Sequence, residues 1–287
     1  MKTILITGTS SGIGQELVRF LSDKQYRIIA TVRKIEDAEK IKKTFLNHVI
    51  PIVIDLSNLS QIEKIPDLLK KEFNIVKLDG LINNAGIALA APFLDQSFSE
   101  VESIISLNVL SVMKLTQVML PLLGAKNPAV DPNKEPGVII NISSISGTGG
   151  APFLAAYAAS KHAIEGFSDA LRKELMIFGI KVVVVGPGSI KTPIWSKGFG
   201  QGADCYAKSI YAESFKKFIS FALNEEKNAL EVSDISKLIF KILNQKNPAF
   251  RYAPIPRKIM NWYIPKLMPK RIYNLLTAKA LGLIRQR

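Results

Sequence analysis

The chain opens with Lys2-Thr-Ile-Leu-Ile-Thr7-Gly8-Thr-Ser-Ser-Gly12-Ile-Gly14, in which a short apolar stretch runs into three glycines. Residues 2–7 predict a strand, and the glycines fall in the turn after it and in the first turn of the helix that follows. Because glycine has no Cβ, backbone N–H groups there can approach a pyrophosphate, and the N-terminus of a helix favours negative charge. The alternative is that the glycines serve only a tight turn.

A second stretch, Tyr157-Ala-Ala-Ser-Lys161, is predicted to open a helix that runs from about Phe153 to about Phe178. Tyr157 and Lys161 are four residues apart, so they share one face of this helix. A nearby ammonium favours the phenolate, and we therefore expect Lys161 to lower the pKa of Tyr157. Ser144 ends a predicted buried strand and is expected to bring its hydroxyl to the same place. The three side chains predict a proton-transfer site, and the alternative is an ordinary solvated helix face.

These stretches, together with Asn83-Asn84-Ala85-Gly86, Asn108 and Pro187-Gly188, resemble the short-chain dehydrogenase/reductase family in order and spacing over residues 2 to about 193. The resemblance implies an α/β fold with a Rossmann-like, doubly wound parallel sheet. It implies a single domain over residues 1–253, followed by a basic, apolar C-terminal extension over residues 254–287. Ala30-Thr-Val-Arg-Lys34 and Arg251-Tyr252 are similar to the hydroxysteroid and retinol dehydrogenase branch.

The resemblance also implies which residues form the site, at the carboxyl ends of the strands. The catalytic residues would be Asn108, Ser144, Tyr157 and Lys161. Tyr157 would exchange a proton with the reacting oxygen, Ser144 would hold that oxygen, and Asn108 would complete a proton relay from Lys161 to solvent. The cofactor would be bound by Gly8, Ser10, Ser11, Gly12, Ile13, Gly14, Arg33, Asp55, Leu56, Asn84, Ala85, Gly86, Tyr157, Lys161, Pro187, Gly188, Ile190 and Thr192.

The predicted strand over residues 27–32 indicates which dinucleotide is bound. It ends without the acidic residue that would accept hydrogen bonds from the ribose 2′-hydroxyl of NAD. Val32 holds that position and Arg33 follows, and a guanidinium there can pair with a 2′-phosphate. The sequence therefore predicts NADP(H) in preference to NAD(H). The alternative is that Arg33, like Lys34, is a solvated residue at a strand end.

Asp55 ends the next predicted strand, over residues 49–54. By resemblance, Asp55 and the Leu56 backbone would contact the adenine. The alternative is that Asp55 or Ser57 caps the helix expected to begin near Leu59.

Composition limits the other classes of function. Cys205 is the only cysteine, and His48 and His162 are the only histidines, so neither an internal disulfide nor a zinc site is expected. No uninterrupted apolar run approaches the roughly 20 residues of a membrane span. The first predicted strand begins too close to Met1 for a secretory signal, and these features together predict a cytoplasmic protein.

The family pattern ends near Pro193. Residues 193–224 predict a mobile loop and helix that close over an apolar substrate site, because they contain Trp195, Phe199, Tyr206, Ile210, Tyr211 and Phe215. The alternative is that these aromatic residues belong to the core. Small residues around Tyr157 allow another helix to approach, and by resemblance we expect a homodimer or homotetramer. Residues 124–137 predict a surface loop.

The C-terminal extension carries much of the net charge of +14. Residues 254–287 contain no acidic residue and eight basic ones: Arg257, Lys258, Lys266, Lys270, Arg271, Lys279, Arg285 and Arg287. A basic segment with interleaved apolar residues can lie in an anionic membrane interface, or it can pack on the substrate pocket. No nucleic-acid-binding motif accompanies the charge, so nucleic acid is not an expected partner.

The sequence as a whole predicts an NADP(H)-dependent reductase that acts on the carbonyl of a lipophilic small molecule such as a steroid, retinoid or fatty carbonyl, or catalyses the reverse oxidation. One alternative is an NAD-dependent alcohol dehydrogenase of the same family. The other is a non-catalytic protein that binds NADPH and serves as a regulator or scaffold at a membrane.

Overall fold

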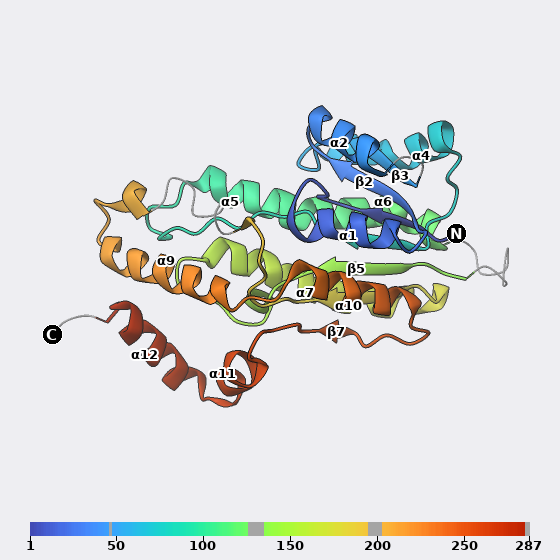
Figure 1. Ribbon diagram of the computed structural model, residues 1–287. Coiled ribbons are helices and arrows are strands. Elements are labelled where there is room, and N and C mark those ends of the chain that lie inside the picture. The colour runs from blue at the N-terminus through green and yellow to red at the C-terminus, as the bar shows by residue number, and fades with distance from the viewer. Residues whose placement is uncertain (46–47, 126–134, 195–202, 285–287) are drawn as a thin grey trace.

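A parallel sheet of seven strands forms the centre of the computed structural model, which describes residues 1–45, 48–125, 135–194 and 203–284 (Figure 1). The strands are β1 Thr3–Ile6, β2 Arg27–Val32, β3 Val49–Val53, β4 Gly80–Asn83, β5 Val138–Ile142, β6 Lys181–Val185 and β7 Arg251–Tyr252. Their order is β3-β2-β1-β4-β5-β6-β7, and every neighbouring pair is parallel. The predicted doubly wound sheet is confirmed, and its order reverses between β1 and β4, the point at which such sheets bind ligands.

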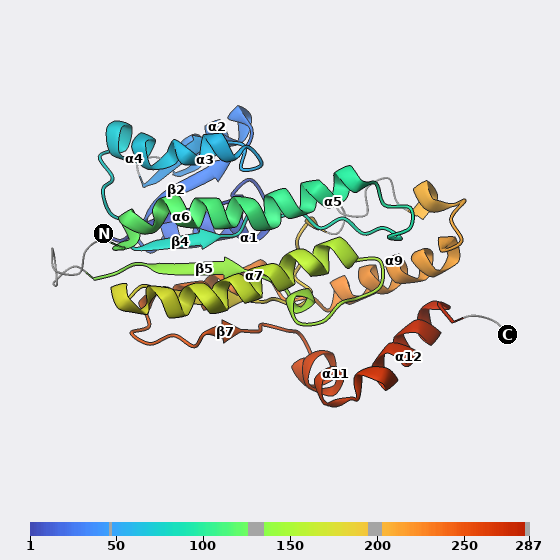
Figure 2. The same cartoon turned by 180° about the vertical axis from the view of Figure 1, so that it is seen from behind.

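Helices cover both faces of the sheet (Figures 1 and 2). They are α1 Gly12–Ser22, α2 Ile35–Phe45, α3 Leu59–Glu63, α4 Ile65–Phe73, α5 Phe98–Ile105, α6 Ser111–Leu123, α7 Ala155–Glu174, α9 Ala212–Lys227, α10 Val232–Asn244, α11 Ile264–Leu267 and α12 Lys270–Leu281. Residues of α1, α2 and α10 pack on one face, and residues of α3, α4, α6 and α7 pack on the other.

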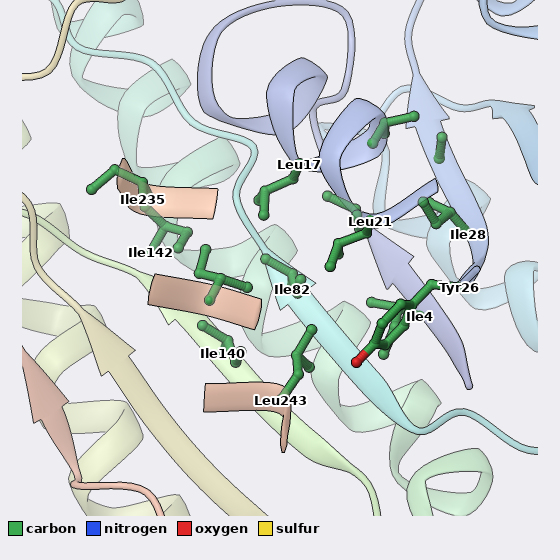
Figure 3. Packing of buried hydrophobic residues seen from close by; sticks show 14 of the residues in the cluster. Ile4, Leu17, Leu21, Tyr26, Ile28, Ile82, Ile140, Ile142, Ile235 and Leu243 are labelled. Carbon is green, nitrogen blue, oxygen red and sulfur yellow. The ribbon is translucent and has the colours of Figure 1, made fainter. Parts of the chain in front are cut away.

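The alternation of side chains along each strand explains why the strands are apolar throughout. Successive residues point to opposite faces, so a strand covered on both sides contributes to two cores. In β1, Ile4 and Ile6 belong to one core and Leu5 to the other, and all three are fully buried. Figure 3 shows the first core, where Ile4 lies on the same side of the sheet as Leu21 of α1 and Leu243 of α10.

The helix that carries Tyr157 and Lys161 begins and ends differently from the prediction. It begins at Ala155, not Phe153, because Phe153 has a φ of +65° and cannot belong to a right-handed helix. Its regular part ends at Glu174, and a tighter 3₁₀ turn continues through Leu175–Phe178. The predicted pair nevertheless lies within the first two turns.

The longest apolar helical stretch, Phe98–Leu123, consists of α5, a π-helical turn at Ser106–Leu110 and α6. Length and composition alone would allow this stretch to cross a membrane. However, it packs along the sheet through the buried residues Leu115, Met119 and Leu123. Thr116 also accepts a hydrogen bond from Asn83 of β4 (3.1 Å). We therefore describe it as a core helix of this domain.

The C-terminal extension leaves the sheet after β7 and forms a π-helical turn at Ile259–Tyr263, followed by α11 and α12. Of these helices, α12 lies beside α9 at one end of the molecule (Figures 1 and 2). Leu281 and Leu283 pack against the aromatic residues of α9, whereas Leu267 is 83% exposed. The extension thus packs on the domain at some positions and presents apolar side chains to solvent at others.

Candidate active site

The glycine-rich turn after β1 is fixed against the end of β4. Gly8 has a φ of +69°, and a Cβ there would lie 2.8 Å from the Cα of Ala85. Asn84 Nδ2 donates to the carbonyl oxygens of Thr7 (2.8 Å) and Gly8 (3.1 Å). The turn therefore requires glycine at this position, and it places the N-terminus of α1 at the carboxyl edge of the sheet. A backbone approach of this kind fits a pyrophosphate.

The remaining residues of the turn differ in their exposure. Ser10 is exposed, Ser11 directly precedes α1, and Ile13 is half-buried and packs on the core. A Cβ on Gly14 would lie 2.2 Å from the carbonyl oxygen of Gly8, so position 14 has no room for a side chain. Close packing of the helix against the turn therefore requires glycine here.

The loop after β6 faces the same turn. Pro187 accepts a hydrogen bond from the backbone N–H of Ile145 (2.9 Å), and the Gly188 N–H donates to Pro254 (3.0 Å). Ile190 is buried. A Cβ on Gly12 would lie 3.4 Å from the Thr192 methyl group. The structure thus brings the glycine-rich turn and the loop after β6 next to each other at Gly12 and Thr192, although these segments are far apart in the sequence.

Arg33 and Asp55 lie after neighbouring strands, β2 and β3. The pKa of Asp55 is lowered, mainly because the Ser57 hydroxyl (2.7 Å) and N–H (2.9 Å) both donate to its Oδ1, with a smaller contribution from the charge of Arg33. The Arg33 side chain is exposed, and Leu56 is buried. This end of the site therefore presents a guanidinium to solvent beside a carboxylate.

The alternative role of Asp55 or Ser57 as a helix cap is wrong. The side chain of Asn58 caps α3 by accepting from the backbone N–H groups of Ser60 (3.1 Å) and Gln61 (3.4 Å). Asp55 and Ser57 instead bond to each other just before the helix, which leaves the cap to the next residue.

Tyr157 and Ser144 meet at the carboxyl end of β5. The Tyr157 side chain is 6% exposed, and its hydroxyl is hydrogen-bonded to Ser144. Burial raises the pKa of Tyr157, and the bond with Ser144 only partly opposes this effect. The predicted lowering of this pKa is therefore wrong for the protein chain by itself, because the cost of burying a phenolate exceeds the favourable contributions. At neutral pH the phenol is protonated and can donate.

Lys161 is also buried, at 6% exposure. Its Nζ donates to the carbonyl oxygen of Ile142 (3.0 Å) and lies 5.7 Å from the centre of the Tyr157 ring. Burial lowers the pKa of Lys161 to about 8, and the carboxylate of Glu165 opposes this shift. The lysine can therefore gain or lose a proton close to neutral pH.

Asn108 occupies the π-helical turn between α5 and α6. Its Oδ1 accepts from the Ile87 N–H (2.9 Å), and its Nδ2 donates to the Ile87 carbonyl (2.9 Å) and to Ser160 Oγ (3.0 Å). A Cβ on Gly86 would lie 3.1 Å from Asn108 Oδ1 and 3.7 Å from Lys161 Nζ. The amide thus holds the segment after β4 against the helix of Tyr157 and Lys161.

Tyr157 belongs to a buried cluster rich in aromatic residues. Its fully or largely buried members are Ala88, Ala90, Phe153, Leu154, Tyr157, Phe215 and Phe218. Tyr206 and Tyr211 pack against it, which fits both the predicted loop and helix over the site and the alternative that these residues belong to the core. Ile210 does not, since it is 83% exposed, and Trp195 and Phe199 lie outside the described residues.

Two charged residues that the sequence did not assign to the site lie next to it. Glu165 follows Lys161 by one helical turn. The Arg251 guanidinium, in β7, pairs with the Glu165 carboxylate at 3.0 Å. Arg251 Nη2 also lies 3.4 Å from the Ser144 carbonyl oxygen. The spacing of Glu165 from Lys161 was a usable signal. No signal in the sequence points to Arg251 as its partner, because only the sheet brings β7 to this place.

Comparison with known proteins identifies the family. A family model described as short chain dehydrogenase matches residues 2–201. The chain is 34% identical over 286 residues to an NADPH-dependent 3-dehydrocapnine reductase from Ornithobacterium rhinotracheale, covering 100% of this chain and 99% of the relative. It is 33% identical over 253 residues to a 3-ketodihydrosphingosine reductase from Bacteroides thetaiotaomicron, covering 86% of each.

A solved structure agrees in fold. The crystal structure of a short-chain dehydrogenase from Streptomyces avermitilis superposes with a TM-score of 0.75 at 24% identity, covering 98% of this chain and 97% of that one. The predicted cofactor, NADP(H), agrees with both Arg33 and the name of the Ornithobacterium relative. The chain therefore belongs to the short-chain dehydrogenase/reductase family of NAD(P)-dependent oxidoreductases.

Proposed function

We propose that the protein is an NADPH-dependent reductase that acts on a ketone in a long-chain lipid. The observation that carries this proposal is that Tyr157, bonded to Ser144, belongs to the same buried cluster as Phe153, Phe215 and Phe218. A proton donor set among aromatic side chains suits a carbonyl group with a long apolar substituent. The apolar residues then bind the chain, and the polar pair selects the carbonyl.

The relatives favour one of the lipophilic substrate classes predicted from the sequence. The Ornithobacterium and Bacteroides proteins are named as reductases of 3-dehydrocapnine and 3-ketodihydrosphingosine. The second of these compounds is a ketone on a long alkyl chain. We therefore favour a fatty ketone over a steroid or a retinoid as the substrate of this chain.

The catalytic roles follow from the positions of the side chains. The Tyr157 hydroxyl, whose raised pKa keeps it protonated, donates a proton to the carbonyl oxygen, and Ser144 hydrogen-bonds to the same oxygen. Bound NADPH supplies the hydride that the carbonyl carbon accepts. Lys161, with a pKa of about 8, returns a proton towards Tyr157. Asn108, whose amide is held by the Ile87 backbone, would complete this relay from Lys161 to solvent.

The residues at the carboxyl edge fit the cofactor. The glycine-rich turn and the N-terminus of α1 would hold the pyrophosphate, and Asp55 with Leu56 would contact the adenine. Arg33 would pair with the 2′-phosphate, which makes NADP(H) preferred over NAD(H). Ile190 and Thr192 would hold the carboxamide, and Asn84, Ala85, Gly86, Pro187 and Gly188 would line the ribose and nicotinamide end.

We place the domain boundary after Ala253. We also propose that the C-terminal extension, residues 254–287, touches a membrane surface, and that the protein is a cytoplasmic one with this peripheral contact. In α12, Leu275 and Leu276 are 59% and 51% exposed and follow Lys270 and Arg271. Apolar and basic side chains together suit an anionic bilayer, from which a lipid substrate would come. Co-sedimentation with anionic vesicles should fall when both leucines are replaced by glutamine, and equal, negligible pelleting of both proteins would end this proposal.

We also propose that α7 mediates a homodimer or homotetramer. Ala155 and Ala159 are exposed, and a Cβ on Gly166 would meet nothing within 4 Å, so a second copy could approach this face closely. Light scattering after size exclusion chromatography tests this expectation, and a monomer at all concentrations would contradict it.

Turnover with a panel of carbonyl compounds tests the main proposal. We expect NADPH consumption with 3-ketodihydrosphingosine, and its loss in Tyr157→Phe while NADPH binding persists. Turnover of a steroid ketone or retinal but not of the long-chain ketone would reject the substrate class. Higher activity with NADH would favour the alcohol dehydrogenase alternative, and NADPH binding without turnover of any compound would favour a non-catalytic regulator.

A further inference from the structure

The C-terminal extension contacts Arg251, next to the active site, through the ring of Trp262. The ring of Trp262 contacts two cations, with the Arg251 guanidinium carbon 5.0 Å from its centre and Lys266 Nζ 3.7 Å from it. Both distances fall within the range of cation–π attraction. Because Arg251 belongs to β7 and Lys266 to α11, the ring joins the extension to the edge of the sheet.

Arg251 also contacts Glu165 and the backbone of Ser144. Its Nε and Nη2 each lie 3.0 Å from a different oxygen of Glu165, which gives a two-point contact. Nη2 also lies 3.4 Å from the Ser144 carbonyl oxygen. A fork of this kind fixes the orientation of the guanidinium as well as its position. The side chain of Arg251 is 23% exposed and that of Glu165 is 17% exposed, so water reaches this ion pair only partly.

The loop that carries Ser144 rests on this ion pair. Ser144 is the N-cap of the short 3₁₀ turn Ile145–Gly147, and its carbonyl oxygen accepts from the Gly147 N–H (3.0 Å). A Cβ on Gly147 would lie 3.0 Å from Glu165 Oε1, so the turn packs directly on the carboxylate. The same carboxylate lies one helical turn from Lys161. A shift of Arg251 or Glu165 would therefore move both sides of the proton-donating site.

We propose that Arg251 is a positioning residue for Ser144, and that Trp262 of the C-terminal extension holds Arg251 in place. The extension is thereby part of the catalytic structure and not only a contact surface. Neither residue touches the reacting atoms, and the inference rests on the proposed role of Ser144 and Tyr157 in donating the proton. It does not depend on which lipid is the substrate.

Hydrogen–deuterium exchange tests this inference without a substrate. Arg251→Gln and Trp262→Ala should speed amide exchange in residues 145–148, with no change in β1. The matched control is Phe250→Ala, because Phe250 lies at the same edge of the sheet, is 67% exposed and has its ring centre 4.7 Å from the guanidinium carbon of Arg172, not of Arg251. Exchange that is unchanged in the first two variants, or faster to the same degree in the control, would overturn the proposal.

Kinetics provide the second measurement. We expect Arg251→Gln to lower kcat by about 10- to 100-fold, as a small misplacement of a catalytic group does, with the KM for NADPH unchanged and partial recovery in Arg251→Lys. Trp262→Ala should lower kcat by about 3- to 10-fold. The double variant should be no slower than Arg251→Gln alone, because Trp262 acts through Arg251.

The two measurements separate the possible failures. Additive effects of the two substitutions on kcat, or an unchanged kcat in Trp262→Ala, would overturn the inference. If the wild-type protein reduces none of the ketones, the proposed function fails, and the exchange experiment still decides whether Trp262 and Arg251 hold the Ser144 loop. If Arg251→Gln does not fold, amide exchange in residues 145–148 and kcat of Trp262→Ala still decide whether the extension holds the Ser144 loop.

Discussion

Replacing Lys161 by methionine should stabilise the folded protein at neutral pH, because it removes a buried charge while keeping a side chain of nearly the same length and shape. The side chain is 6% exposed, and burial lowers its pKa from 10.5 to about 8. A shift of this size corresponds to about 3 kcal/mol of destabilisation when the amine is charged in both states. Loss of the bond from Nζ to Ile142 offsets about 1 kcal/mol of the gain.

The pH dependence gives the sharper test. Because the folded-state pKa lies below the unfolded-state value, the unfolded chain binds more protons between these two values, and the wild-type free energy of unfolding rises with pH there. The methionine variant has no such dependence. The difference in the free energy of unfolding between the variant and the wild type should therefore shrink by about 2 kcal/mol from about pH 7 to about pH 9.5. This range lies below the pH at which the titration of Tyr157 contributes with the opposite sign.

Urea unfolding of both proteins without added cofactor, followed by circular dichroism at several pH values, measures this difference. Lys173→Met is the matched control, because Lys173 lies on the same helix with 71% of its side chain exposed and pairs with Asp169. Its difference from the wild type should stay flat across this range. If the advantage of Lys161→Met does not change with pH, the amine has an ordinary pKa, and our account of the burial of this site is wrong.

Three other outcomes are expected from the same structure. Arg33→Ala should weaken NADPH binding by about 10- to 100-fold, the effect of one lost charge-assisted contact, and leave NADH binding unchanged; equal loss for both would reject the 2′-phosphate assignment. Phe215→Ala should lower the free energy of unfolding by about 3–5 kcal/mol, because this side chain is fully buried, whereas Phe221→Ala on the same helix, 62% exposed, should change it little. Gly14→Ala should abolish cofactor binding, as measured by NADPH fluorescence, because its Cβ would lie 2.2 Å from a backbone oxygen, while Gly166→Ala, with open space around it, should bind normally.

The sheet could be predicted from the sequence because its signals are local. Apolar runs rich in β-branched residues, such as residues 27–32, indicate strands that are covered on both faces, and the observed β2 matches the predicted range. Tyr157 and Lys161 share a helix, so their spacing alone places them on one face. The family pattern then related these stretches to the turn after β1.

What the sequence left undetermined depends on distant parts of the chain. The pKa of Tyr157 follows from its burial, and the cluster that buries it includes Phe215 and Phe218 of α9, which are distant from it in the sequence. The contact between Arg251 and Glu165 exists only because β7 joins the sheet beside β6. The cap of α3 is undetermined by the sequence for a more local reason, since three neighbouring residues, Asp55, Ser57 and Asn58, all have side chains that suit a cap.

The two borders of the sheet bear on how the protein avoids self-association into fibrils. An unpaired border strand offers a row of amide and carbonyl groups to which a foreign chain can add, unless the strand is interrupted. At one border, β3 contains Pro51, which has no N–H to donate. At the other, β7 is only two residues long and begins with a charged arginine. Each border thus presents a poor template for strand addition, so a seven-stranded apolar sheet can remain dispersed at high concentration.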